Sequence, residues 1–311
     1  MDDREELRST LETLATERVD PAFAELDMLG TLDQVTLMAE QGVVAAKAVA
    51  EERESIARAV DGIVERLGRG GRLVYIGAGT AGRMGVLDAS EIPPTYGTDP
   101  SLVTGVIAGG EHALRNAVEN AEDDADAGAE VGATLGPDDV IVGVSASGRT
   151  PYVAAALRAA RERGAFTVSL ACNRGAEISQ GVDVAIEVVV GPEVVAGSTR
   201  LKAGTAQKLV LNTLSTLAMV QSGKVYGNLM VDVQSTNEKL RARAERTVMH
   251  ATGCTPEAAA AALDEAAGSV KLAIAIVETG ADADTARAAL EEAGGHLRAA
   301  LAATRSAGRD G

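Results

Sequence analysis

The sequence predicts an α/β protein: a doubly wound parallel sheet flanked by helices, with further helices at the N-terminus and a small helical module at the C-terminus. Five apolar runs of strand length lie between residues 72 and 191, with helix-like stretches among them. Continuous apolar strands of this kind are typical of a parallel sheet covered on both faces. Glycine-containing turns follow the first and third runs, and 46% of the residues are hydrophobic, which is enough for a large buried core.

A helical region precedes the sheet and is expected from residue 1 to about 70. Apolar side chains recur there at helical spacing on one face, at Ile56, Val60, Ile63, Val64 and Leu67. The glycine-rich sequence "GRGG" at 68–71 then ends the region.

Strands and helices alternate through the centre of the chain. The expected strands lie at 72–76, at 102–110, within "DVIVGVSASGRT" (139–150), at 165–173 and at 182–191. The expected helices lie at about 80–91, around 112–125, at 151–164 and, after the last strand, at 203–222. Pro93 and Pro94 are expected to end the first of these helices, because proline lacks the amide hydrogen and biases its predecessor away from helix.

The last sixty residues predict a compact helical module without chemistry of its own. Thr255 is the expected N-cap of a helix that has Pro256 at its first position and Gly268 after its end. Two more short helices follow, around 269–280 and 282–295. We therefore divide the chain into N-terminal helices at 1–60, a central domain at 61–248 and the C-terminal module at 249–311.

Composition excludes several classes of protein. The formal net charge of −16, the 2% of aromatic residues and the absence of Trp argue against a nucleic-acid-binding surface. No apolar run approaches the roughly 20 residues of a membrane span, and the start "MDDREELRST" has no secretory signal, so a cytoplasmic location is expected. Two cysteines make no disulfide framework, and the three histidines lack metal-ligand spacing, so no metal site is expected.

The stretch "LVYIGAGTAGRMG" (73–85) contains the G-x-G-x-x-G spacing of a dinucleotide site at Gly77, Gly79 and Gly82. Such a site also needs an acidic residue roughly 20 positions further on, which binds the ribose. Here the second strand is followed by Glu111, 29 positions beyond Gly82. A nicotinamide or flavin cofactor is therefore disfavoured.

Three turns rich in hydroxyl groups, each with a cation, instead predict a phosphate site. Any one of them could simply cap a helix, but three together favour one small phosphorylated ligand. The candidate residues are Gly79, Thr80 and Arg83 in the first turn, Ser145, Ser147, Gly148, Arg149 and Thr150 in the second, and Ser198, Thr199 and Lys202 in the third.

Five motifs in this order resemble the N-acetylmuramic acid 6-phosphate etherases of the sugar isomerase (SIS) superfamily. They are "GAGTAGRMGVLDASEIPPTYG", "AVENAED", "SASGRTPYV", "GPEVVAGSTRLKAGTAQK" and "GKVYGNLMVDVQSTNEKL", and the resemblance covers about residues 60–311. It implies a SIS-type fold, a UBA-like C-terminal module, and a homodimer that completes its site at the interface. It also implies cleavage of a lactyl ether with no metal or redox cofactor. The chain departs from the family pattern at "MAEQG" (38–42), Ile92 and Ser145.

By the same resemblance, Glu91 and Glu122 are the catalytic residues. The sequence supports both weakly, since Glu91 is expected at a helix C-terminus, where the dipole disfavours negative charge, and Glu122 lies in an acidic cluster. Which glutamate is the acid and which is the base stays open. Two other functions also stay open: a sugar-phosphate isomerase, and a non-catalytic sugar-phosphate-binding regulator.

Overall fold

The computed structural model describes residues 14–232 and 238–307, which form two compact units. We call them the sheet unit and the helical unit. The sheet unit comprises Met1–Ser90 and Ser101–Ser215, and the helical unit comprises Glu91–Pro100 and Thr216–Gly311.

The sheet unit contains five parallel strands in the order β2-β1-β3-β4-β5. Their bounds are β1 (Leu73–Gly77), β2 (Val103–Ile107), β3 (Val140–Ser145), β4 (Phe166–Ala171) and β5 (Val184–Glu187). Every residue of β1 and β3 is buried, because helices cover both faces of the sheet. The predicted fold class is confirmed.

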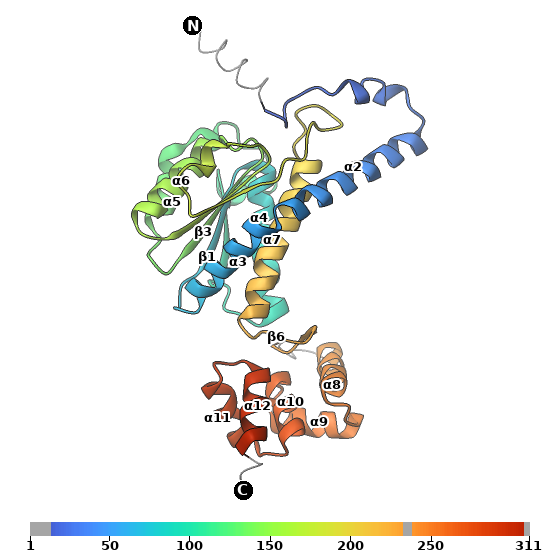
Figure 1. The fold of residues 1–311 in the computed structure, drawn as a ribbon, viewed down its shortest axis with the longest axis vertical. Coiled ribbons are helices and arrows are strands. Elements are labelled where there is room, and N and C mark those ends of the chain that lie inside the picture. The colour runs from blue at the N-terminus through green and yellow to red at the C-terminus, as the bar shows by residue number, and fades with distance from the viewer. Residues whose placement is uncertain (1–13, 233–237, 308–311) are drawn as a thin grey trace. The chain divides into compact units, whose positions relative to one another are not determined.

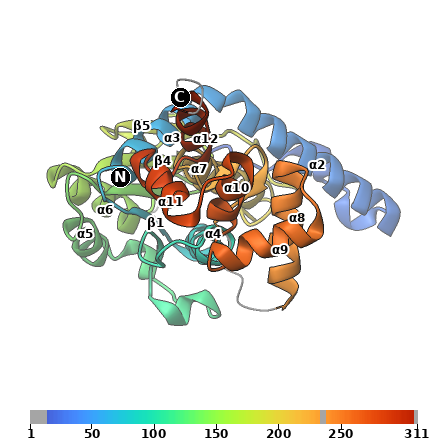
Figure 2. The same ribbon diagram turned by 90° about the horizontal axis from the view of Figure 1, so that it is seen from below.

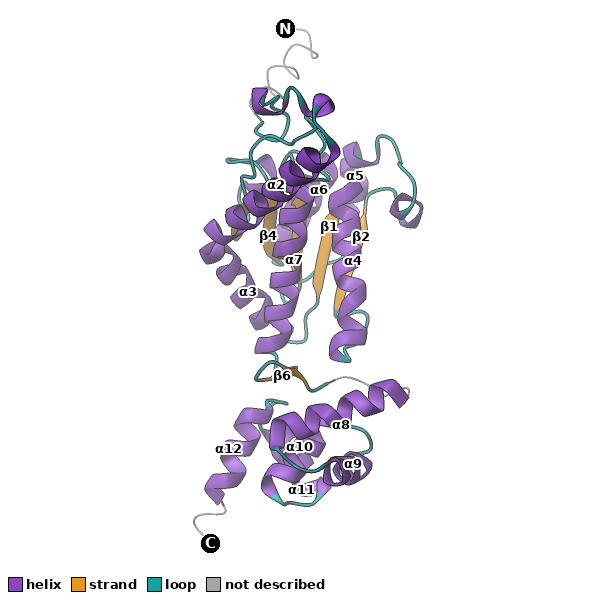
Figure 3. Ribbon diagram, turned by 90° about the vertical axis from the view of Figure 1, so that its right-hand side faces the viewer, coloured by secondary structure: helices purple, strands orange, loops and turns teal. Residues whose placement is uncertain are grey.

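The helices of the sheet unit precede, connect and follow its strands. They are α2 (Thr31–Glu51), α3 (Arg53–Leu67), α4 (Gly79–Tyr96), α5 (Ala125–Ala133), α6 (Pro151–Glu162) and α7 (Lys202–Gln221). The last residues of α4 and α7 belong to the helical unit. In Figure 1, α5 and α6 lie on one side of the sheet and α3 and α7 on the other. In Figure 3, β1 and β2 appear in orange behind α4 and α7.

Alternate residues of β1 supply the two sides of this core. Val74 and Ile76 pack in the same cluster as Val153 and Leu157 of α6. Tyr75 points to the opposite face, where the buried carboxylate of Asp88 on α4 lies near its hydroxyl. Burial is the main cause that raises the pKa of Tyr75, and the negative charge of Asp88 is the second.

The N-terminal helical prediction is only partly right. Residues 1–13 lie outside the described residues, and 14–30 form turns and two short 3₁₀ helices (Pro21–Phe23 and Leu26–Met28) ahead of α2. Pro21 lacks an amide hydrogen, and Gly30 is extended, with φ −65° and ψ 153°, so this stretch does not join α2 in a continuous helix. The predicted stop after Leu67 is confirmed.

The expected end of the helix at Pro93 is wrong, since α4 continues to Tyr96 with both prolines inside it. The side chains of Ile92 and Tyr96 are buried, so tertiary packing holds this last turn. Gly97 closes it by donating its N–H to the Pro93 carbonyl at 2.9 Å, with a φ of +63°.

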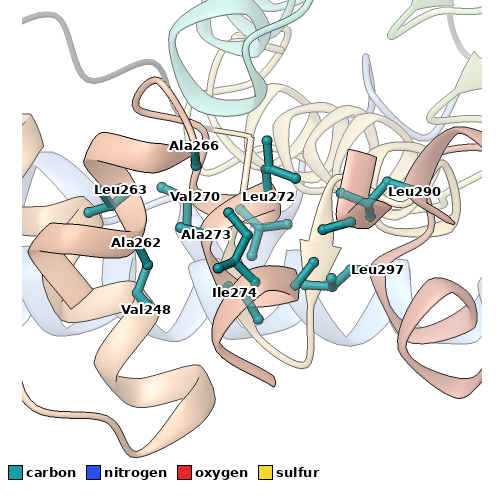
Figure 4. Packing of buried hydrophobic residues seen from close by; sticks show 14 of the residues in the cluster. Val248, Ala262, Leu263, Ala266, Val270, Leu272, Ala273, Ile274, Leu290 and Leu297 are labelled. Atoms are coloured by element: carbon teal, nitrogen blue, oxygen red, sulfur yellow. The ribbon is translucent and has the colours of Figure 1, made fainter. Parts of the chain in front are cut away.

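The helical unit has five short helices of its own and a two-stranded hairpin. They are α8 (Glu238–Thr252), α9 (Pro256–Glu265), α10 (Val270–Thr279), α11 (Ala283–Glu292) and α12 (Leu297–Ala307), with β6 (Val225–Tyr226) and β7 (Leu229–Met230). The central α10 contacts each of the other four helices (Figure 2). Figure 4 shows the resulting core of Leu, Ile, Val and Ala side chains, among them Leu263, Ile274 and Leu290. The predicted cap is confirmed, since the Ala258 N–H donates to Thr255 Oγ1 at 3.3 Å.

Candidate active site

The site is expected where the strand order reverses, because ligands of doubly wound sheets bind there, outside the carboxyl ends of the strands. That point lies between the neighbouring strands β1 and β3, since β2 lies beyond β1 and β4 beyond β3. Gly77 at the end of β1 is in register with Val144 near the end of β3. The first two predicted phosphate turns therefore start side by side.

The first turn brings α4 directly against the end of β1. A Cβ atom on Gly82 would lie 2.7 Å from the Gly77 carbonyl oxygen, so only glycine permits this approach. The helix begins at Gly79, with Thr80 as its second residue. Amide groups at the start of a helix favour an anion, so the turn can take part in a phosphate site without a dinucleotide.

The second turn is organised around the buried hydroxyl of Ser145. Its Oγ accepts the Gly148 N–H at 3.0 Å and lies 2.8 Å from Thr150 Oγ1 and 3.3 Å from Ser147 Oγ. Gly148 has a φ of +75°, a left-handed conformation that favours glycine. Ser145 therefore holds the shape of the turn, at the start of α6, that presents Ser147 and Arg149.

The third turn lies beside the first. A Cβ atom on Gly204 would be 3.4 Å from the Thr80 methyl carbon and 3.5 Å from the Thr199 carbonyl oxygen. The structure thus brings parts of all three predicted turns to one edge of the sheet. Arg200 in this turn is exposed, whereas Ser198 and Thr199 are half-buried.

The start of α7 in this turn is closed by a carboxylate of the protein itself. Glu193 is buried, and its two oxygens accept the backbone N–H groups of Lys202 and Ala203, each at 2.9 Å. Sequence reasoning missed Glu193. The sequence feature that could have revealed it is an acidic residue that lies among apolar ones in "GPEVV", just before the hydroxyl-rich turn.

Lys202 is buried at this helix start and directed at the N-terminal helices. Its Nζ donates to Gln41 Oε1 at 2.8 Å and lies 5.7 Å from the centre of the Phe23 ring. Burial lowers the pKa of Lys202, although the charges of Glu193 and Asp20 oppose that shift.

Glu122 lies on a loop between β2 and α5, where the sequence predicted a helix around 112–125. That prediction is wrong: short 3₁₀ turns at Glu111–Leu114 and Ala121–Asp123 flank an irregular stretch. Asn120 is left-handed, with a φ of +60°. The guanidinium of Arg83 donates hydrogen bonds to two backbone carbonyls of this loop, those of Leu114 and Asn116. In a continuous helix, these carbonyls would accept hydrogen bonds from N–H groups of the helix itself.

Several of the predicted site residues line cavities of the sheet unit, but they do not all line the same one. Gly79, Arg83 and Glu122 line a cavity of about 230 Å³. Ser147 and Arg149 line another of about 610 Å³. Within the described part of the chain, no group of three or more His, Cys, Asp or Glu side chains is placed to hold a metal ion.

Glu91 lies on the exposed surface of α4, in the segment that groups with the helical unit. Because α4 runs on to Tyr96, Glu91 is more than one turn from the helix end. The helix dipole therefore gives no support to a catalytic role of Glu91, because its effect falls off within the last turn of a helix.

The chain is similar to known proteins at three levels: family models, named relatives and solved structures. The family model of the glucokinase regulatory protein N-terminal SIS domain matches residues 55–161, and that of the SIS domain matches 113–217. A protein of Rubrobacter xylanophilus named N-acetylmuramic acid 6-phosphate etherase is 56% identical over 84% of this chain and 87% of its own. A protein of the same name from Streptomyces avermitilis is 54% identical over 86% and 87%. Among solved structures, a phosphoheptose isomerase from Neisseria gonorrhoeae aligns with a TM-score of 0.47 and 18% identity, covering 61% of this chain and all of that one.

Proposed function

The chain belongs to the N-acetylmuramic acid 6-phosphate etherase family, and we propose that it carries out the reaction of that family with Glu122 and Glu91 as its proton-transfer groups. It is a carbon–oxygen lyase that converts N-acetylmuramic acid 6-phosphate into N-acetylglucosamine 6-phosphate and D-lactate, a step in the recycling of cell-wall amino sugars. The observation that carries the assignment of Glu122 is a cavity beyond the ends of β1 and β2. Glu122 lines it together with Gly79 and Arg83 of the first turn.

The reaction needs two proton-transfer groups because an ether oxygen is a poor leaving group. Ring opening exposes an aldehyde at C1, which acidifies the proton on C2. A base removes that proton, an acid protonates the ether oxygen as D-lactate leaves C3, and water adds to the C2–C3 double bond. Each well-placed acid or base typically contributes about 10²–10⁴-fold in rate.

The phosphate and the reacting carbons lie at opposite ends of the sugar, so different elements serve them in this proposal. The turn of Ser147–Thr150 and the start of α4 at Gly79 and Thr80 bind the phosphate through hydroxyl and amide groups. The buried hydroxyl of Ser145 holds the shape of the turn of Ser147–Thr150 through its hydrogen bonds. Ser198, Thr199 and Lys202 complete the anionic subsite from the third turn, and Glu122 faces the C2–C3 end.

We further propose a cytoplasmic homodimer in which a second copy completes the site. Helix α2 supports the dimer, because it exposes an apolar face: Leu32 is 77% exposed, Val35 59% and Val43 54%. Such a face is typical of a protein–protein contact. Among the described residues, no helix combines the length with the apolar character that a membrane span needs. The domain limits at residues 60 and 248 remain part of the proposal.

Lactate release from N-acetylmuramic acid 6-phosphate in deuterated water, with no metal or nucleotide added, tests the function. We expect D-lactate together with one deuterium at C2 of the sugar product. Deuterium exchange at C2 without lactate would indicate an isomerase instead. Tight sugar-phosphate binding with neither signal would indicate a regulator. Sedimentation that shows a fully active monomer would contradict the dimer.

A further inference from the structure

Arg83 is the cation of the first turn, yet its guanidinium binds backbone carbonyls. Its Nε donates to the Leu114 oxygen at 3.0 Å, and its Nη2 donates to the Asn116 oxygen at 3.1 Å. Hydrogen bonds from a charged donor are stronger than those between neutral groups. One side chain on α4 therefore holds the loop that connects β2 to α5 at two points.

The backbone of Arg83 is held in place by the packing of Gly82, the residue before it. Gly82 packs against the Gly77 backbone, and a Cβ atom on it would also lie 2.6 Å from the Ile107 side chain at the end of β2. Arg83 follows directly, so its backbone is held between β1 and β2. The loop is thus tied to the closely packed ends of β1 and β2.

The two bonds decide the course of the loop toward Glu122. In a continuous helix, the carbonyls of Leu114 and Asn116 would accept the N–H groups of residues 118 and 120. With both carbonyls bonded to Arg83, the chain instead turns through the left-handed Asn120, and Glu122 follows two residues later. Arg83 and Glu122 line the same cavity, so the arginine that holds the loop lies at the cavity to which Glu122 belongs.

We propose that Arg83 is a positioning residue for Glu122, and that its role is to hold the loop of residues 111–124 rather than to bind the substrate phosphate. This inference rests on the proposed function, in which Glu122 transfers a proton. It replaces the phosphate role that the sequence suggested for Arg83. A misplacement of about 1 Å at a reacting group can cost about 10²-fold in rate, so loss of the clamp is expected to act on turnover.

The test compares Arg83→Gln and Arg83→Lys with Arg115→Gln, which alters an exposed arginine of the same loop. Three quantities are measured: kcat for lactate release, the Kd of N-acetylglucosamine 6-phosphate by calorimetry, and amide hydrogen exchange over 111–124. For Arg83→Gln we expect kcat to fall about 100-fold with Kd changed by less than about threefold. Exchange near 114–122 should rise about tenfold, because the loop opens more often.

Arg83→Lys should recover part of the turnover, since an ammonium group can bond one of the two carbonyls. Arg115→Gln should match the wild type in all three measurements. A Kd raised more than about tenfold in Arg83→Gln, with unchanged exchange, would make Arg83 a phosphate ligand and overturn the proposal. Unchanged values throughout would overturn it as well. If the wild type released no lactate, the proposed function would fail, whereas the exchange data would still decide whether Arg83 holds the loop.

Discussion

The two units differ in what they bury. Among the described residues with buried polar or charged side chains, all but Lys271 belong to the sheet unit, including Asp88, Glu193 and Lys202. The helical unit buries almost only Leu, Ile, Val and Ala, and its Lys271 is paired with Asp232 at 2.9 Å. Buried polar groups need bonded partners, so they are retained where a site needs fixed groups. The sheet unit is therefore held together in part by bonded polar groups, whereas the helical unit is held together mainly by apolar packing.

The largest effect is expected for Glu122→Gln in the sheet unit. Lactate release should fall roughly 10²–10⁴-fold, because the amide cannot transfer the proton. Binding of N-acetylglucosamine 6-phosphate and the melting temperature should stay close to wild type, since Glu122 is exposed and its removal leaves no buried group unpaired. Steady-state kinetics, calorimetry and thermal unfolding measure these three quantities.

Glu130→Gln is the matched control for that variant, because Glu130 is an exposed acid on the neighbouring helix α5. Its turnover should equal that of the wild type. Near-normal turnover in Glu122→Gln would remove Glu122 from the mechanism. An equal loss in both variants would mean that the general acidity of this surface matters and not one carboxylate.

The two cysteines, one in each unit, offer a second contrast. Burial, and after it the charge of Glu193, raises the pKa of the Cys172 thiol from 9.0 to about 12, whereas Cys254 is half-buried. At pH 8 the thiolate fraction of Cys172 is then lower by about 10³-fold than at an ordinary pKa, and the thiolate is the reactive form. Iodoacetamide should label Cys254 and leave Cys172 unmodified until the protein unfolds.

Mass spectrometry of the labelled peptides measures that difference, and Cys172→Ala is its control. The variant should keep the whole fast labelling phase of the wild type, because that phase belongs to Cys254. Rapid modification of Cys172 in the folded protein would contradict the burial of the β4 end beside Glu193 and α7.

Glu193→Ala tests how much the sheet unit depends on a buried carboxylate. The change leaves the N–H groups of Lys202 and Ala203 without their acceptor in a buried place. Each such group costs about 1–3 kcal/mol, so the two together predict a loss of about 2–6 kcal/mol in the free energy of unfolding. Urea unfolding measures it. Glu193→Gln keeps one oxygen acceptor and should lose less, whereas equal stability of both variants and wild type would refute the capping role.

The fold could be predicted from sequence because its signals are local. Apolar runs mark the strands, glycines mark the turns after β1 and β3, and Thr255 with Pro256 marks the start of α9. These features depend on neighbours within a few positions, and the tertiary contacts of the described residues agree with them.

The site could be predicted only in part because its errors arise from long-range contacts. The helix expected around 112–125 is replaced by a loop when Arg83, some thirty residues earlier, bonds its carbonyls. α4 passes Pro93 because Ile92 and Tyr96 are buried in the tertiary structure. The cap of α7 comes from Glu193, nine residues before the helix, where helix rules inspect only the adjacent position.

The smallest effect is expected for Asp282→Ala in the helical unit, which removes an exposed cap. The Asp282 carboxylate accepts the Thr285 N–H at 2.8 Å, and that hydrogen bond lowers the pKa of Asp282 below its ordinary 3.8. A carboxyl group with a lowered pKa stabilises the fold fully above its unfolded value, and that contribution is lost as the pH falls through the folded value. The difference in melting temperature between wild type and Asp282→Ala should therefore be small at pH 7 and shrink below pH 3.8. Glu291→Ala, which removes another exposed acid of the same helix α11, is the matched control. A difference that persisted in acid would mean that Asp282 acts through its shape and not through its charge. Lactate release by Asp282→Ala should equal that of the wild type at every pH, because the cap supports only the apolar core around α10 and α11.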